Sequence, residues 1–520
     1  MAAYSATGLE SHRKDSKCHY LIVWPQKGRL MDVLYFLTSP AGPQETAFLE
    51  RSDELGPIPG DHRWIIAVSI IVRRIIAFFR KPVEFFGFLV EYVLNLLSEN
   101  GNLPGLLYNL VRGRVLLPRR NSETFISTIG HLDGRIDLYK GHSLAGLGDQ
   151  MGNKALMDLC MMASKLAYEN ALVAPLSTVT VPTTPVVETL SIASSVLFLQ
   201  RNKLFAPSYL KDFQKDYSTQ VFIICDKSED ASLVLISFRG TEPFDADDWS
   251  TDFDYSWYEI PGLGKVHMGF LEALGLGNRA EVQTFQEHLQ LGGEPQSATD
   301  SDSQSDSKGD DGDMTEVTAY YAVRSRLRIL LRQHKNAKFV VTGHSLGGAL
   351  AILFPTVLLL HGEKEMMKRL LRVYTFGQPR IGDRQLGRYM EAHLNHPVPR
   401  YYRLVYSNDL VPRLPYDDKT FLYKHFGLCL YYNSFYNVEE EPNRNYFGLR
   451  YVFPEYLNAF WELIRSFLMS YTYGPDYKEG WFSIMLRIVG LAIPGLSAHS
   501  PVDYLNSVRL GRERVQMSSI

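Results

Sequence analysis

Cysteine is scarce in this chain. The 520 residues include four cysteines, which lie far apart at positions 18, 160, 225 and 429. Their separation excludes the close spacings of a disulfide framework or a zinc site, and it favours a reducing compartment over secretion. The first twenty residues are polar and lack the apolar core of a signal peptide. We therefore expect a protein that faces the cytosol.

Net charge and long apolar runs are also lacking. The formal charge of −3 argues against a nucleic-acid partner. No uninterrupted apolar run reaches the roughly 18 to 20 residues that a bilayer crossing needs. Acidic residues are concentrated in one Ser/Asp/Gly-rich tract at 292–313. Its composition predicts a solvated insert between two helices.

The amino-terminal part divides into a polar leader and linker at 1–60 and an apolar, basic region at 61–125. Two apolar stretches, Trp64–Phe79 and Val83–Leu97, are joined by Arg80-Lys81-Pro82, where we expect the proline to break the helix. Basic, aromatic helices of this kind are typical of segments that lie in a membrane surface. The alternative is a pair of helices buried against the rest of the protein.

One stretch, Lys338 to Leu350, has the pattern of a nucleophile elbow. Apolar strand residues run into Gly343-His344-Ser345-Leu346-Gly347, and an apolar helix follows. Such a turn holds a serine at the carboxyl end of a strand, with glycine two residues before and after it because a Cβ there would clash. Ser345 is therefore the predicted nucleophile. A similar string around Ser143 has Ala145 in place of the second glycine, so we reject it.

Short apolar strands alternate with helices from about residue 150 to 511. Strands are expected at 221–225, 233–238, 371–376 and 401–406, in addition to the strand before Ser345. This alternation predicts an α/β-hydrolase fold, with a mostly parallel sheet covered by helices on both faces.

The acid and the histidine of a catalytic triad follow the serine in this fold. Asp383 and Asp409 both lie just past strand ends, and Asp409 is preferred because a short turn places it at the same sheet edge as Ser345. Only two histidines follow Asp409, His425 and His499. The residues alone leave that choice open.

Several strings in this part of the chain occur in the order and spacing of the class 3 lipases. They are Phe238-Arg239-Gly240-Thr241, Lys265 to Phe270, Gly343 to Gly348, Thr375 to Arg380 and Asn408 to Pro412. The strings Arg239 to Tyr258 and His499 to Tyr504 resemble those of plant oil-body triacylglycerol lipases. Residues 171–200 depart from the charged, aromatic segment that this resemblance implies.

The resemblance assigns roles. It makes His499 the catalytic histidine, since a tyrosine follows it near the carboxyl end, and His425 a strand residue without catalytic function. It implies an oxyanion hole at Thr241 and Leu346, and a lid at 242–254.

The expected activity is hydrolysis of triacylglycerol at a lipid-droplet or membrane surface, with no metal or organic cofactor. A phospholipase A1 or galactolipase of the same family is the alternative within hydrolases, and a non-catalytic, lipase-like signalling protein is the alternative outside them.

Overall fold

The structure is a computed structural model. It describes residues 19–39, 46–136, 153–169, 197–199, 219–289, 318–416, 422–441 and 449–511, apart from positions 53, 54, 56, 57, 121, 123 and 228. Ser143, most of residues 171–200 and the acidic insert at 292–313 lie outside the described residues.

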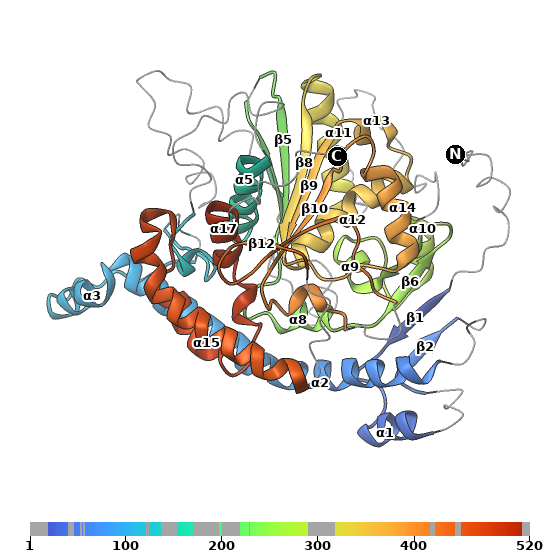
Figure 1. Cartoon of the computed structure of the whole chain (residues 1–520), viewed down its shortest axis with the longest axis horizontal. Coiled ribbons are helices and arrows are strands. Elements are labelled where there is room, and N and C mark those ends of the chain that lie inside the picture. Colours follow the sequence, from blue (N-terminus) through green and yellow to red (C-terminus); the bar gives the residue numbers. More distant parts are fainter. Residues whose placement is uncertain are drawn as a thin grey trace, which may run out of the picture.

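An eight-stranded sheet forms the centre of the molecule (Figure 1). Its five adjacent strands β5, β8, β9, β10 and β11 run parallel, and β3, β4 and β12 pair antiparallel at the two edges. The sheet is therefore mixed, with the parallel centre that the alternating pattern predicts. In spatial order the strands are β12 (Val438–Glu439), β11 (Leu428–Tyr432), β10 (Tyr401–Tyr406), β9 (Leu370–Phe376), β8 (Lys338–His344), β5 (Leu233–Phe238), β4 (Val221–Cys225) and β3 (Leu197–Leu199).

Helices cover both faces of this sheet, because alternate strand residues face opposite ways. In β5, Val234 and Ile236 pack in one core cluster, and Leu235 packs in the other. The first cluster includes α9 (Met268–Ala273), α10 (Gln283–His288), α11 (Ala319–Gln333), α12 (Leu346–Leu360), α13 (Lys364–Lys368) and α14 (Arg384–Leu394). The second includes α5 (Asn153–Leu166) and α17 (Pro501–Leu510), which Figure 1 shows on the opposite side.

A second, antiparallel sheet joins the amino-terminal region to the catalytic region. Its order is β2 (Leu49–Arg51), β1 (Tyr20–Val23), β6 (Trp257–Ile260) and β7 (Gly264–His267). Strand β1 pairs with β6 across more than 230 residues of chain, with Leu21 opposite Trp257. The segment expected to be a leader and linker thus supplies two strands. Helix α1 (Leu30–Thr38) lies between them in sequence.

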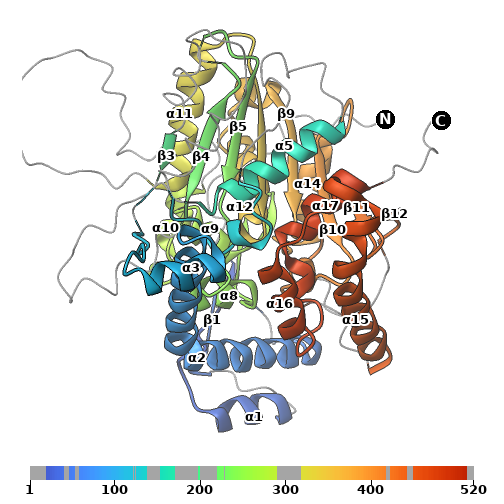
Figure 2. The same cartoon turned by 90° about the vertical axis from the view of Figure 1, so that its left-hand side faces the viewer.

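Helix α2 (Gly60–Glu99) runs through the apolar region as one element of 40 residues. The prediction that Pro82 separates two helices is wrong. Proline removes one hydrogen bond and bends a helix, and contacts on both sides compensate: Arg80 pairs with Glu84 across the proline at 2.9 Å, and Phe86 packs edge-on against Phe244. Figure 2 shows the axis of α2 changing direction along its length. Helix α3 (Asn102–Val111) follows.

One face of α2 is buried in the protein. Ile65, Ile66 and Ile70 pack with Tyr255 and Trp257 in a core cluster. The alternative that this region is buried against the rest of the protein therefore holds for this face of α2, and the membrane-surface interpretation does not apply to it. The opposite face carries exposed aromatic residues, among them Phe78 and Phe85 at 78% and 69% exposure. Among the described residues, no helix is long and apolar enough to cross a membrane.

Two further helices, α15 (Leu449–Thr472) and α16 (Trp481–Gly490), come from the carboxyl-terminal part of the chain. Figure 2 shows both of them at the same end of the molecule as α2 and the short helix α8 (Ala246–Asp252), and Figure 1 shows α15 beside α2. This end also holds the carboxyl ends of the parallel strands, so the outer helices surround the edge at which the candidate site lies.

Candidate active site

Ser345 occupies a strained turn between β8 and α12. Its backbone has φ 59° and ψ −133°, which a residue with a side chain rarely adopts. The close approach of the chain explains the two flanking glycines. A Cβ on Gly343 would lie 2.1 Å from the Gly347 carbonyl oxygen, and one on Gly347 would lie 2.3 Å from that of Phe238. The predicted elbow geometry is therefore present at Ser345.

Asp409 and His499 are hydrogen-bonded to each other. Asp409 follows β10 by a short turn, and His499 Nδ1 lies 2.8 Å from its Oδ2. The carboxylate is fully buried. Its other oxygen accepts the Val411 backbone N–H at 2.9 Å, and the Tyr504 hydroxyl donates to Oδ2 beside His499. Three donors thus fix the carboxylate, which in turn fixes the imidazole.

Ser345 lies next to this pair. Its backbone N–H donates to Phe376 O at 2.9 Å, and the following residue, Gly377, has no room for a Cβ because one would lie 2.8 Å from His499 Cε1. Ser345 Oγ and His499 Nε2 are both buried, and neither has a hydrogen-bond partner in the part of the chain that the structure describes. These are the two atoms between which a nucleophile and its base exchange a proton.

The competing candidates have other partners. Asp383 is the N-cap of α14 and accepts the Leu386 N–H at 2.9 Å. His425 bonds the Pro412 carbonyl oxygen through Nε2 at 2.5 Å, and burial holds its pKa well below the usual range. Both residues therefore have structural partners, and neither is joined to the other.

The two residues expected to form an oxyanion hole are Leu346, within the elbow, and Thr241, on the segment that passes beside it. Leu346 is the first residue of α12, so its N–H has no acceptor within its own helix. Thr241 follows Gly240, where a Cβ would lie 2.3 Å from the His344 carbonyl oxygen and 3.0 Å from Ser345 Cβ. The chain leading to Thr241 therefore passes against the nucleophile turn.

Helix α8 covers this site within the segment expected to be a lid. The Trp249 ring lies 6.2 Å from the His499 ring, measured between centroids, at 68°. Asp252, at the end of the helix, is fully buried, and neither carboxylate oxygen has a partner among the described residues. Burial raises its pKa well above the ordinary value, and the nearby Asp248 and Asp409 raise it further. Burial also raises the pKa of Asp248, to about 7.

Helix α2 holds α8 in this position. Arg80 pairs with Asp247 at 2.8 Å, and a Cβ on Gly87 would lie 2.4 Å from Phe244 Cβ. After α8, Ser69 donates to the Phe253 carbonyl oxygen at 2.7 Å and Arg73 pairs with the buried Asp254 at 2.7 Å. The helix expected to meet lipid therefore contacts the lid along its length, which the sequence pattern did not indicate.

His344, next to the nucleophile, is a second histidine at the site. Its ring lies 4.6 Å from that of His499, and its Nδ1 is 2.9 Å from the Tyr168 hydroxyl. Burial, followed by the proximity of His499, holds the pKa of His344 well below the usual range. His344 therefore stays neutral and does not oppose a positive charge on His499. Among the described residues there is no group of three or more His, Cys, Asp or Glu that could hold a metal ion.

Comparison with known proteins gives concordant matches. The family model for Lipase (class 3) matches residues 235–419, which include Thr241, Ser345 and Asp409. A triacylglycerol lipase OBL1 of Nicotiana tabacum is 57% identical, over 90% of this chain and 86% of its own length. The proteins of the same name from Arabidopsis thaliana and Ricinus communis are 53% and 42% identical, and each match covers at least 96% of both chains.

Proposed function

Because this chain belongs to the class 3 lipase family, we propose that it hydrolyses triacylglycerol through a serine, histidine and aspartate triad. The observation that carries the proposal is the Asp409–His499 hydrogen bond beside a serine in a strained strand-to-helix turn. The substrate class is supported by the three relatives, which are named triacylglycerol lipases.

The reaction proceeds in two halves. His499 Nε2 takes the Ser345 proton as Oγ attacks an ester carbonyl, and Asp409 stabilises the imidazolium that forms. The tetrahedral intermediate collapses with loss of diacylglycerol, whose alkoxide receives that proton from His499. Water then attacks the acyl-enzyme by the same route and releases a fatty acid. Backbone N–H groups of Leu346 and Thr241 hold the oxyanion in both halves, each worth about 3 kcal/mol.

Opening of α8 is required before this reaction, because Ser345 is almost fully buried and Trp249 covers His499. We assign the lid role to residues 242–254 on this basis. A lipid surface favours the open arrangement if it contacts the helices that hold α8 closed.

The test is turnover on three substrates: emulsified trioleoylglycerol, dispersed phosphatidylcholine and a soluble short-chain ester. A triacylglycerol lipase hydrolyses the first and third. Hydrolysis of the phosphatidylcholine with little release from trioleoylglycerol would identify a phospholipase A1 instead. Absence of turnover on all three would support a non-catalytic protein.

We further propose that the exposed aromatic face of α2 binds the lipid-droplet surface. Phe78, Phe79 and Phe85 are all more than half exposed, and full burial of each in lipid is worth about 1.5–3 kcal/mol. Deleting residues 60–125 would remove Ile65 and Ile66 from the core and destabilise the protein. Point substitutions therefore make the sharper experiment.

A fluorescent full-length fusion should coat droplets in cells, and the F78S/F79S/F85S variant should become largely diffuse. A matched control changes two exposed apolar residues elsewhere, Ile329 and Val398, to serine. Equal droplet coating by all three proteins would contradict the assignment of α2.

A further inference from the structure

Three charged residues of α15 and α16 lie on the inner side of these helices. Arg465 is fully buried, and Glu462 and Arg487 are each 2% exposed. Arg465 Nη2 pairs with Asp503 Oδ1 at 2.8 Å, and Arg487 Nη2 contacts the same oxygen at 2.9 Å. Arg487 also pairs with Glu479 at 2.5 Å and with Glu462 at 3.4 Å. This network ties both helices to α17 beneath them.

The outward faces of the same helices are apolar. Phe460, Phe467 and Tyr471 of α15 are 55%, 56% and 90% exposed, and Trp481, Ile488 and Val489 of α16 are each more than half exposed. Of the charged residues between Phe453 and Thr472, Glu455 is half-buried and the other two belong to the buried network. A helix on a water-facing surface has the opposite arrangement, with its charges outside.

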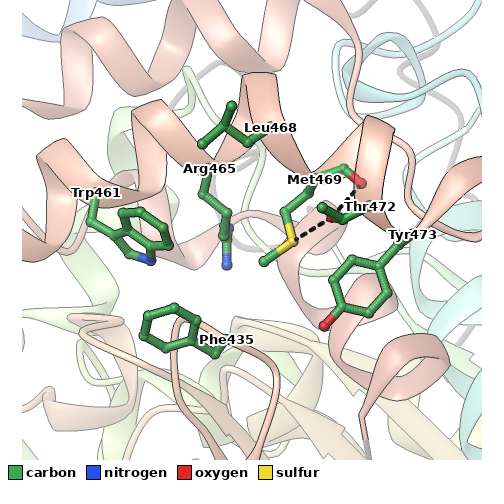
Figure 3. Close-up of a pocket in the computed structure, with 7 residues that line it drawn as sticks. All are labelled: Phe435, Trp461, Arg465, Leu468, Met469, Thr472 and Tyr473. Carbon is green, nitrogen blue, oxygen red and sulfur yellow. Dashed lines mark hydrogen bonds between the residues drawn. The ribbon is translucent and has the colours of Figure 1, made fainter.

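A pocket opens on α15 and is lined by Phe435, Trp461, Leu468, Met469, Thr472 and Tyr473 around Arg465 (Figure 3). Its volume is about 440 Å³. The Arg465 guanidinium donates through Nη1 and Nη2 to the Tyr406 hydroxyl, the Ser434 carbonyl and Asp503, which leaves the buried Nε as its one nitrogen without a partner among the described residues. The pocket therefore suits an apolar chain better than an anion.

The position of these helices indicates what covers them. They lie at the end of the molecule that also carries α2 and α8 (Figure 2). A lipid surface that touches α2 would lie against the helix that holds α8 over His499, since Arg80 of α2 pairs with Asp247 at 2.8 Å. A protein partner would be expected to meet several outward charges. Where the burial of side chains in α15 and α16 is described, Glu455 is the only charged residue outside the buried network, and it is half-buried; the exposed Asp476 and Lys478 lie in the connection between the helices.

We propose that α15 and α16 form a second lipid-contacting surface, which binds the phospholipid-coated oil surface together with α2 and receives acyl chains between its aromatic side chains. The proposal rests on the proposed function, since it takes the substrate to be an insoluble lipid. The two helical surfaces would then seat the protein with α2, which holds α8 closed, against the oil.

The experiment measures binding apart from turnover, by flotation of the full-length Ser345→Ala protein with phosphatidylcholine-coated trioleoylglycerol droplets. The added changes F460S/F467S/Y471S should lower the floated fraction at least five-fold. The added changes I329S/V398S should leave it unchanged. Thermal melting confirms that each variant is folded.

A second measurement does not depend on the triple variant. Droplets coated with brominated phosphatidylcholine quench tryptophan that enters the acyl region, and Trp481 is 56% exposed on α16. Quenching should fall clearly in Trp481→Phe.

The proposal would be overturned if the F460S/F467S/Y471S variant floated as well as the protein without these changes. It would also be overturned if Trp481→Phe left the quenching unchanged. Sedimentation of both proteins supplies one more outcome: normal flotation by a triple variant that is monomeric where the wild type is dimeric would overturn the proposal too, by assigning the face to a protein contact. Failure of the proposed function looks different: the protein that keeps Ser345 floats with the droplets and yet releases no fatty acid from them.

Discussion

The sheet edge and the outer helices both bury polar groups, but they leave them in different states. At the sheet edge, Ser345 Oγ, His499 Nε2 and both oxygens of Asp252 have no partner among the described residues. Under α15 and α16, the charges of Arg487, Asp503, Glu462 and Glu479 satisfy one another, and the two unpaired atoms there, Arg465 Nε and Trp461 Nε1, belong to residues that line the pocket. An unpaired buried polar atom costs stability. Such atoms are therefore expected where a bound substrate or a conformational change will give them a partner. Paired buried charges hold a structure together.

The largest expected effect is on the rate of hydrolysis. Ser345→Ala and His499→Ala should each lower kcat on the soluble ester by roughly 10⁴-fold or more, and by similar factors, because the triad acts as a unit. The melting temperature of Ser345→Ala should hardly change, since no bond to Ser345 Oγ is lost; that of His499→Ala should fall, since the buried Asp409 loses a hydrogen bond. Matched controls are Ser143→Ala and His425→Ala, with activity corrected for any unfolding. Retained turnover in His499→Ala with loss in His425→Ala would reverse the assignment of the histidine.

The next effect is on stability alone. Arg487→Met leaves Glu479 and Glu462 buried without their cation, and it should lower the free energy of unfolding by about 3–5 kcal/mol. Urea denaturation measures the change, and Arg388→Met, at an exposed position of α14, is the control expected within about 0.5 kcal/mol of wild type. Turnover per folded molecule on the soluble ester should be unaffected. A variant as stable as wild type would mean that the network does not hold α16.

A smaller effect depends on pH. Burial raises the pKa of Asp248 to about 7, so the folded protein keeps a proton that the unfolded chain releases near pH 4. The contribution of Asp248 to the free energy of unfolding therefore falls as the pH rises from about 4 to about 7, and it no longer changes with pH above about 7. Asp248→Asn should raise the melting temperature relative to wild type at pH 8 more than at pH 4.5. An equal difference at both pH values would show that Asp248 ionises normally.

The smallest effect is expected from the acidic insert. Deleting residues 292–313 removes no apolar side chain of consequence, and closing a shorter loop changes the entropy only slightly. Turnover should stay within about two-fold of wild type and the melting temperature within a few degrees. Collapse of expression or activity would mean that the insert packs against the protein.

The sequence was sufficient to predict the central strands and the elbow, because these depend on local pattern. Apolar runs of five to seven residues form β4, β5, β8 and β9, and the glycines at 343 and 347 are required by contacts within the turn itself. Asp409 and the two later histidines could be selected by order along the chain.

Features that depend on distant contacts could not be predicted. Asp252 lies in an acidic segment that looks solvent-exposed, and it becomes buried because α8 folds onto the site under α2, whose Ser69 meets Phe253 across 184 residues. Glu462 and Arg465 occupy positions i and i+3, which from sequence alone would be placed on the water-facing side of a helix. Their partners, Asp503 and Arg487, come from other helices. The continuity of α2 through Pro82 could not be predicted either, since the contacts that maintain this helix are tertiary.

The outward aromatic face of α15 and α16 gives the protein one apolar end, which makes it surface-active. Surface-active proteins gather at any boundary between water and air, plastic or oil. Purified without detergent, the protein should lower interfacial tension and disappear from dilute solution onto vessel walls. On an emulsion, each molecule occupies a fixed area of boundary, so the rate of hydrolysis saturates with interfacial area and not with the mass of oil. Finer emulsions of the same oil should therefore be consumed faster.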